Sequence, residues 1–278
     1  NIIMNKPAKL AFEKIASKGS KKRNLIILHG MLGNKFNFRG LSKRPEMSGE
    51  ADAYLLDLRN HGESEHKPTS NIEDYSNDIT HFMDTHGIED AVLLGHSMGG
   101  KAAMKTAMDQ PKRIKGLILA DIGPYNYADP AQFPNIGNVE LLTFMQNLRT
   151  DQLTREQIRE KLGRFLEGKT AVVDFVMTNI AADKDGKLKW RVNLPAIINS
   201  YENFSSYVPE EGRAYSGPTL SIYGTRSEFM PKERFPEFKN YFTKMKLERD
   251  FKPIEGGHWV HFVDPESFLR YVQGFQQS

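Results

Sequence analysis

Hydrophobic and polar positions divide the chain into short apolar runs that alternate with amphipathic segments. Five apolar runs lack any period-two alternation and end at a glycine, a proline or a polar residue: Leu25–Gly30, Ala53–Gly62, Ala91–Ser97, Ile114–Pro124 and Pro218–Glu228. Runs of this length without alternation are typical of strands that are buried on both faces of a parallel sheet. The pattern therefore predicts strands in all five places.

Helical periodicity dominates the segments between these runs. Ile72–Gly87 carries apolar residues at helical spacing and ends on glycine, and Gly99–Pro111 is rich in alanine and methionine and ends at proline. Residues 265–278 predict a terminal helix. Strands that alternate with helices predict an α/β protein with a mainly parallel sheet covered on both faces.

The alternation is interrupted between the fourth and the fifth apolar run. From about residue 125 to residue 215 there is no strand pattern, and residues 138–149, 154–168 and 169–181 have helical periodicity instead. We therefore predict an α/β core of residues 1–124 and 216–278. Residues 125–215 are predicted to form a helical cap inserted between two strands of one sheet.

Composition excludes several classes of protein. With 278 residues, 39% of them hydrophobic and 26% charged, the composition predicts a soluble globular protein, and no run approaches the roughly 20 apolar residues of a membrane span. The net charge of +3 arises from 38 basic and 35 acidic residues without a basic block that alternates with aromatics. Nucleic acid is therefore not an expected partner.

Cysteine is absent from the sequence. This excludes disulfides, thiolate metal sites and cysteine nucleophiles, and it favours an intracellular location. The first residues lack the apolar region of a signal peptide. We expect the cytoplasm, or the mitochondrial matrix if a presequence has been removed.

The most informative motif is G-x-S-x-G at Gly95–Gly99, which follows a predicted strand and precedes a predicted helix. This is the context that a nucleophile elbow requires, because glycines permit the tight turn that lifts the serine hydroxyl above the sheet. The sequence therefore predicts Ser97 as a nucleophile rather than as a simple turn residue. The backbone N–H of Met98, at the helix N-terminus, is predicted to bind an oxyanion.

A serine nucleophile needs a base and a second oxyanion donor. His258 follows two glycines late in the chain, just before the terminal helix, and is favoured over His261 as the base. His29-Gly30 closes the first strand, so the N–H of Met31 is the candidate for the second donor.

Two carboxylates compete for the role of the acid that orients the histidine. Asp121 ends the fourth apolar run and Glu228 follows the fifth, so both lie at the same edge of the predicted sheet. The sequence pattern favours neither carboxylate as the acid. Asp57 is expected to support a neighbouring loop, and Asp264 to cap the last helix.

Taken together, "LHGMLGNKFNF", "LDLRNHGES", "GHSMGGKAAM", "LILADIGP" and "GGHWVHF" resemble the α/β-hydrolase superfamily over nearly the whole chain. More narrowly, they resemble the small esterase branch with bacterial short-chain acyl and acyl-CoA esterases, mitochondrial abhydrolase-domain esterases and yeast ethanol acetyltransferase. The resemblance implies a cap inserted after the sixth strand of that fold, and it implies no metal and no organic cofactor. It favours Asp121 as the acid and leaves Glu228 as the alternative.

The expected activity is that of a serine carboxylesterase on short- to medium-chain acyl esters or thioesters. The alternatives are acyl transfer or thioester hydrolysis on the same triad, or a slow, receptor-like hydrolase that binds a small ligand. We expect a small-molecule substrate and a monomer or small homo-oligomer. Six residues are expected to line the substrate pocket: His29, Phe144, Met145, Phe165, Phe175 and Trp259.

Overall fold

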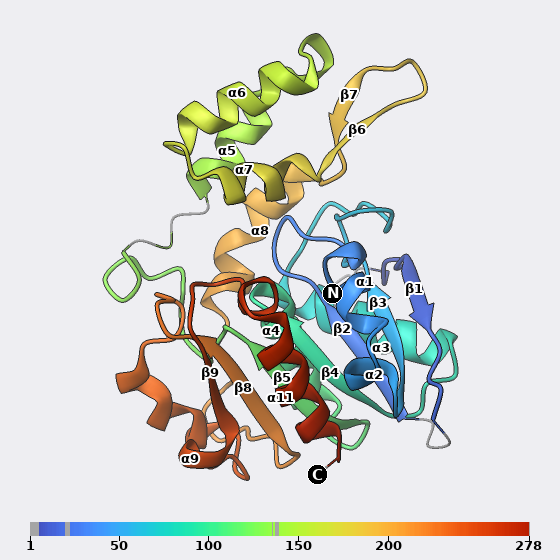
Figure 1. Ribbon diagram of the computed structural model, residues 1–278, viewed down its shortest axis with the longest axis vertical. Helices are drawn as coiled ribbons and strands as arrows, with labels where there is room; N and C mark the ends of the chain where they lie inside the picture. The colour runs from blue at the N-terminus through green and yellow to red at the C-terminus, as the bar shows by residue number, and fades with distance from the viewer. Residues whose placement is uncertain (1–5, 20–22, 135, 137–138, 278) are drawn as a thin grey trace, which may run out of the picture.

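The computed structural model describes residues 6–19, 23–134, 136 and 139–277, and a seven-stranded sheet forms its centre (Figure 1). The strand order is β1-β3-β2-β4-β5-β8-β9, and every pair is parallel except β1 with β3. The strands are β1 (Phe12–Ile15), β2 (Arg23–Leu28), β3 (Ala51–Leu56), β4 (Ala91–His96), β5 (Ile114–Ala120), β8 (Thr219–Gly224) and β9 (Phe251–Ile254). This confirms the predicted fold class.

The five predicted strands are the five central strands of this sheet, whereas the two edge strands were not predicted. β1 is short and alternates exposed with half-buried residues, and β9 carries Pro253. Proline and polar alternation are typical of sheet edges, because one side of an edge strand has no neighbouring strand to form hydrogen bonds with. A search for continuous apolar runs therefore finds the buried centre of a sheet and misses its borders.

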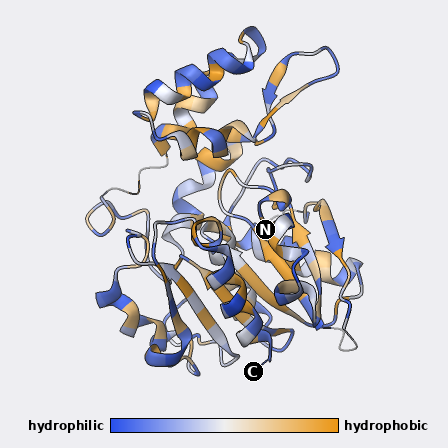
Figure 2. Cartoon of the chain, viewed as in Figure 1, coloured by the Kyte–Doolittle hydropathy of each residue, from blue (hydrophilic) through white to orange (hydrophobic). Residues whose placement is uncertain are grey.

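Helices cover both faces of the sheet, and successive residues of each central strand feed two separate cores. Ile26 and Leu28 pack with residues of α3 (Ile72–Thr85) and α4 (Met98–Asp109), while Leu25 and Ile27 pack with residues of α11 (Pro265–Gln277). The remaining short helices of this core are η1 (Lys35–Phe38), α1 (Arg39–Ser42), α2 (Pro45–Ser48), η3 (Lys232–Asn240), α9 (Leu247–Asp250) and α10 (Val260–Val263). Figure 2 shows the corresponding concentration of apolar residues in the central strands.

The elements described within residues 125–215 are α5 (Val139–Asn147), η2 (Thr150–Gln152), α6 (Arg155–Phe165), α7 (Thr170–Met177), β6 (Ile180–Ala182), β7 (Leu188–Trp190) and α8 (Leu194–Ser206). Most of them lie above the carboxyl edge of the strands, with α6 and the hairpin of β6 and β7 farthest from the sheet (Figure 1). The segment follows β5, which is the fifth strand of this sheet along the sequence. The expectation that it contains no strand was wrong, since β6 and β7 form an antiparallel hairpin.

Lys101 connects the two ends of this cap segment to helix α4. The side chain is buried, and its ammonium donates hydrogen bonds to the carbonyls of Tyr125 and Tyr207, which enter and leave the segment. Burial lowers the pKa of Lys101 well below its usual value. The helix that begins at the predicted nucleophile is thus fixed to both connections of the cap.

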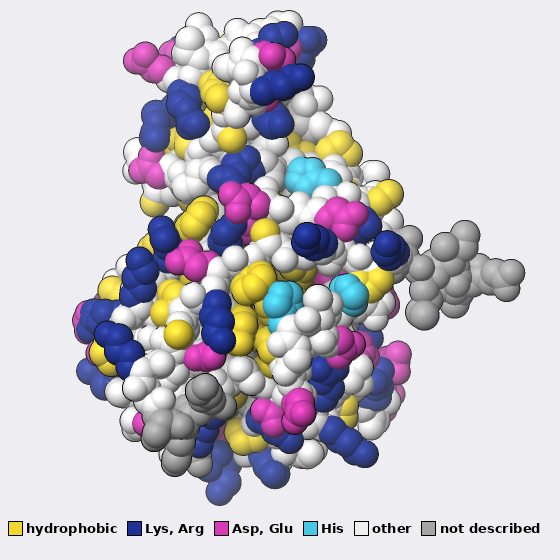
Figure 3. All heavy atoms as spheres, turned by 90° about the vertical axis from the view of Figure 1, so that its right-hand side faces the viewer, with side chains coloured by type: hydrophobic (Ala, Val, Ile, Leu, Met, Phe, Trp, Pro, Cys, Tyr) yellow, Lys and Arg dark blue, Asp and Glu magenta, His cyan; other side chains and the backbone are white. Residues whose placement is uncertain are grey.

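The distribution of surface charge and the lengths of the helices are relevant to binding of charged partners and of membranes. On the face shown in Figure 3, basic and acidic side chains are interspersed. Among the described residues, no helix combines the length and the apolar character needed to traverse a bilayer.

A buried ion pair fixes the loop between β3 and α3. Arg59 is fully buried and donates two hydrogen bonds to Asp78, at 2.6 and 2.7 Å, with Asp74 at 3.0 Å from its guanidinium. The carbonyl of Arg59 also accepts a hydrogen bond from His61. The pair therefore stabilises a loop that, as described below, supports the candidate site.

We expect Arg59→Ala to lower the free energy of unfolding by about 3–5 kcal/mol, because it leaves the carboxylate of Asp78 buried without its partner. Urea denaturation measures the change. Arg164→Ala is the control: Arg164 pairs with Glu160 on the surface, where both side chains are mostly exposed, so its loss should cost less than about 1 kcal/mol. Equal effects of the two substitutions would contradict the prediction.

Candidate active site

Ser97 lies at a sharp turn between β4 and α4. Its backbone has φ 52° and ψ −121°, a strained conformation for a residue with a side chain. The glycines on either side have no room for a Cβ atom: one at Gly95 would lie 2.3 Å from the carbonyl oxygen of Gly99, and one at Gly99 would lie 2.4 Å from that of Leu28. Both glycines of G-x-S-x-G are therefore required by the packing of this turn.

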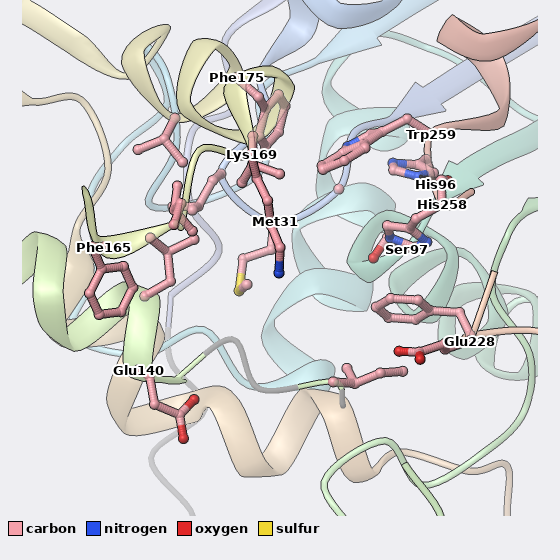
Figure 4. A pocket seen from close by; sticks show the side chains of 18 of the residues that line it. Met31, His96, Ser97, Glu140, Phe165, Lys169, Phe175, Glu228, His258 and Trp259 are labelled. Atoms are coloured by element: carbon pink, nitrogen blue, oxygen red, sulfur yellow. Dashed lines mark hydrogen bonds between the residues drawn. The ribbon is translucent and has the colours of Figure 1, made fainter. Parts of the chain in front are cut away.

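His258 and Asp121 meet at the same edge of the sheet. Asp121 directly follows β5 and is fully buried, and its Oδ2 lies 2.7 Å from Nδ1 of His258, in the loop after β9. Its Oδ1 accepts a hydrogen bond from the N–H of Gly224 at 2.7 Å, and the hydroxyl of Ser227 donates to Oδ2. These bonds hold the carboxylate with one oxygen toward the histidine. Figure 4 shows His258 beside Ser97.

The other candidate carboxylates lie elsewhere. Glu228 lines the cavity above Ser97 (Figure 4), and its carboxylate is not the one bonded to Nδ1 of His258. Asp57 accepts hydrogen bonds from the backbone N–H groups of Lys35 and Glu63, so it supports the neighbouring loop. Asp264 accepts a bond from the N–H of Ser267 in the first turn of α11, which is a capping contact.

Two further histidines lie near His258: the ring of His96 packs against that of His258, and the ring of His261 packs against that of His96. His261 is buried and stacks on Phe38, with ring centroids 4.3 Å apart. Burial, with a smaller effect of His258, lowers its pKa to about 3. His96 donates from Nε2 to the carbonyl of His258 at 3.0 Å, and burial lowers its pKa well below the usual value. His96 therefore fixes the loop that carries His258, a role that the sequence analysis missed although His96 precedes Ser97.

The loop after β2 orients the N–H of Met31. The carbonyl of Gly30 accepts hydrogen bonds from Nδ1 of His29 at 2.7 Å and from the N–H of Gly33 at 2.9 Å. In a trans peptide the N–H points away from the C=O, so the Met31 N–H faces the opposite side. No hydrogen bond between described residues uses this N–H. The N–H of Met98 begins α4 and likewise has no partner within the helix.

The next residue of this loop, Leu32, has φ 60° and is held from two sides. Its N–H donates to Nε2 of His61 at 3.3 Å, and its carbonyl accepts a hydrogen bond from the side-chain amide of Asn179 at 2.7 Å. Asn179 is buried and belongs to the cap segment. The conformation of the loop therefore depends on both the core and the cap.

A cavity of about 540 Å³ lies over Ser97 and His258, between the core and the cap (Figure 4). Of the six residues expected to line it, Phe165, Phe175 and Trp259 do so. The other three do not. Phe144 stacks on Phe165, Met145 is fully buried, and His29 points inward, where its Nε2 accepts a hydrogen bond from Leu58.

Several lining residues were missed. Phe229 stacks on the ring of His258, with centroids 3.8 Å apart, and Leu32 and Val172 contribute further apolar surface, next to the expected Met31. Lys169 reaches into the cavity from the start of α7 toward Met31 (Figure 4). The sequence offered one indication that Phe229 lies at the site: it directly follows Glu228, a candidate acid, in the loop after β8.

Comparison with known proteins places the chain in a family. Residues 23–265 match the family described as alpha/beta hydrolase fold. The sn-1-specific diacylglycerol lipase ABHD11 of Danio rerio is 30% identical over 275 residues, which cover 98% of this chain and 83% of that protein. A probable alcohol acetyltransferase of Saccharomyces cerevisiae is 28% identical over 281 residues, which cover 94% of this chain and 80% of the relative.

A solved structure titled marine microorganism esterase superposes with a TM-score of 0.88 at 28% identity, covering 96% of this chain and 99% of that one. These likenesses confirm the predicted resemblance and the predicted class of enzyme, a hydrolase of the carboxylesterase type. The chain belongs to the α/β hydrolase fold family.

Proposed function

We propose that the protein is a serine esterase in which Ser97 is the nucleophile, His258 the base and Asp121 the acid that orients it. One observation carries the proposal: a strained serine at a strand-to-helix turn lies beside a histidine whose Nδ1 is 2.7 Å from a fully buried carboxylate. A carboxylate in this place selects the tautomer with Nδ1–H and leaves Nε2 free to accept a proton from serine.

The reaction has two steps. In the first, Oγ of Ser97 attacks the ester carbonyl carbon while its proton moves to Nε2 of His258. The bond to the alcohol oxygen then breaks, the alcohol leaves with that proton, and an acyl-serine remains. In the second, water attacks the acyl-serine while His258 takes one of its protons. The carboxylic acid leaves, and the proton returns to Oγ of Ser97.

The N–H groups of Met31 and Met98 are the proposed oxyanion donors. Both flank Ser97 and have no acceptor among the described residues, and the peptide before Met31 is fixed by the bonds to Gly30. Each donor of this kind lowers the barrier by about 3 kcal/mol, because it is aligned before charge develops. The hydrogen bonds of Leu32 to His61 and Asn179 support this alignment.

Acyl transfer to an alcohol is the second candidate, since the Saccharomyces cerevisiae relative carries that name. In this chain it is supported by the apolar surface near His258, where Phe175, Phe229 and Trp259 line the cavity. An alcohol that binds there would replace water in the second step. Addition of 1-octanol to an ester assay distinguishes the two, because transfer yields the octyl ester and hydrolysis yields only the acid.

We expect a fluorophosphonate probe to label the protein at one site and to abolish hydrolysis of p-nitrophenyl acetate in proportion to labelling. Peptide mass analysis should place the label on Ser97, and Ser97→Ala should take up none. His261→Phe is the control that keeps the site and should label normally, since His261 does not contact the cavity. Hydrolysis that persists after complete labelling, or a label on another residue, would overturn the proposed function.

A further inference from the structure

Two cavities of very different size meet at Ser97. The larger, of about 540 Å³, is lined by His258, Phe175 and Trp259. The smaller, of about 30 Å³, lies between α4 and α8 and is lined by Met98 and Phe204 but not by His258. Met31, Ser97, Ile136 and Phe229 line both cavities, so the two open onto the same reacting atoms.

The chemistry of the site assigns a different part of the substrate to each cavity. In the tetrahedral intermediate, the carbonyl carbon carries Oγ of Ser97, the oxyanion, the alcohol oxygen and the acyl chain. The oxyanion faces the N–H groups of Met31 and Met98. The alcohol oxygen must accept a proton from His258, so the alcohol extends into the larger cavity that His258 lines. The smaller cavity, away from His258, is left for the acyl chain.

The volume of the smaller cavity limits that chain. In the same measure the smaller cavity has about 30 Å³ and the larger one about 540 Å³. A short acyl chain such as acetyl therefore fits the smaller cavity better than a hexanoyl chain does, while the larger cavity has room for a long alcohol.

The walls of the smaller cavity are held in place by the core. Phe204 is buried and makes edge-to-face contacts with Tyr75 and Tyr201, at centroid distances of 6.1 and 5.4 Å. The hydroxyl of Tyr75 donates to Sδ of Met98 at 3.3 Å. Lys101 also lines the cavity, but two backbone carbonyls bind its ammonium. These contacts oppose a widening of the cavity on the side of α4 and α8, and the aromatic lining favours an uncharged acyl chain.

We propose that the smaller cavity is the acyl subsite, and that the substrates are esters of short-chain acids with larger, apolar alcohols. The inference rests on the proposed function, because it uses His258 as the group that protonates the leaving alcohol. In this assignment the 540 Å³ cavity binds the alcohol part of the ester and not the acyl chain.

Octyl acetate and ethyl octanoate test the assignment, because they are isomers that differ only in which side of the ester carries the long chain. We expect kcat/KM to be at least tenfold higher for octyl acetate. p-Nitrophenyl acetate and p-nitrophenyl hexanoate provide a second comparison with one common leaving group, and the acetate should again be favoured at least tenfold.

Two variants link the preference to the cavities. Phe204→Leu widens the smaller cavity and should reduce the acetate-to-hexanoate preference about tenfold. Phe175→Ala, in the larger cavity, is the matched control: it should raise KM for octyl acetate and leave the acetate-to-hexanoate preference unchanged. The wild-type comparison stands even if Phe204→Leu does not fold.

The outcomes separate this inference from the proposed function. An equal or reversed preference in both wild-type comparisons, in a protein whose Ser97 still reacts with the fluorophosphonate, overturns the acyl subsite alone. Absence of both ester hydrolysis and labelling overturns the proposed function, and the subsite with it.

Discussion

Asp121→Asn is expected to lower kcat for p-nitrophenyl acetate by about 10⁴-fold with little change in KM. The carboxylate accepts a hydrogen bond from His258 Nδ1 at 2.7 Å and is fixed by Gly224 and Ser227. An amide NH₂ group in place of that oxygen turns the acceptor into a donor. His258 then carries its proton on Nε2 and cannot take one from Ser97.

Glu228→Gln is the matched control, since it makes the same chemical change in a carboxylate that lines the cavity but is not bonded to Nδ1 of His258. Its kcat should stay within about threefold of the wild type. Steady-state kinetics on both variants, with circular dichroism to verify folding, measure the difference. A large loss in Glu228→Gln together with an active Asp121→Asn would move the acid to the loop after β8.

The stability of the protein is expected to fall steeply between pH 7 and pH 5. Four buried histidines are responsible: His29, His61, His96 and His261. Burial is the main cause that lowers all four pKa values, to about 3 for His61 and for His261. In the unfolded chain each histidine has a pKa near 6.5.

The direction follows from proton binding. Below about pH 6.5 the unfolded state binds protons that the folded state does not, so acid favours unfolding until the folded pKa values are reached. At pH 5 His61 and His261, each with a folded-state pKa of about 3, remove roughly 2 kcal/mol apiece. The lowered pKa values of His29 and His96 add to this loss. The loss is a substantial part of the total stability of a typical domain, about 5–15 kcal/mol.

Urea denaturation at pH 7 and pH 5 measures this loss. His261→Phe is the control, because it keeps a ring stacked against Phe38 and removes one titrating group. The loss between the two pH values should then be smaller by roughly 2 kcal/mol. A free energy of unfolding that is the same at pH 7 and pH 5 would be incompatible with neutral, buried histidines.

The central sheet and the turn at Ser97 could be predicted because their signals are local. A strand buried on both faces is a continuous apolar run, and the elbow needs glycines next to the serine, whose contacts with Leu28 and Gly99 leave no room for a side chain. The hairpin of β6 and β7 could not be found in this way, since each strand has only three residues.

The choice between Asp121 and Glu228 could not be made from the pattern, because both residues follow strands that end at one edge of the sheet. In the structure, the direction of the Asp121 carboxylate depends on Gly224 and Ser227, more than 100 residues away. The pocket was harder still. Helical periodicity does not tell which apolar side chains of the cap face the core, so Phe144 and Met145 were expected in the cavity. Phe229 was overlooked because it lies in the loop after β8, where no periodic pattern indicates which way a side chain points.

The bond from Asn179 to the carbonyl of Leu32 has a consequence for engineering by exchange of caps. A foreign cap grafted onto this core brings a new pocket, but it also removes the amide that holds the loop after β2. Such a chimera would have a reshaped cavity over a loosened loop that carries the proposed oxyanion donor Met31, and its low activity would be mistaken for a poor fit of substrate. Donor caps for this scaffold should therefore be chosen first for an amide at this position, and only then for the shape of their cavity.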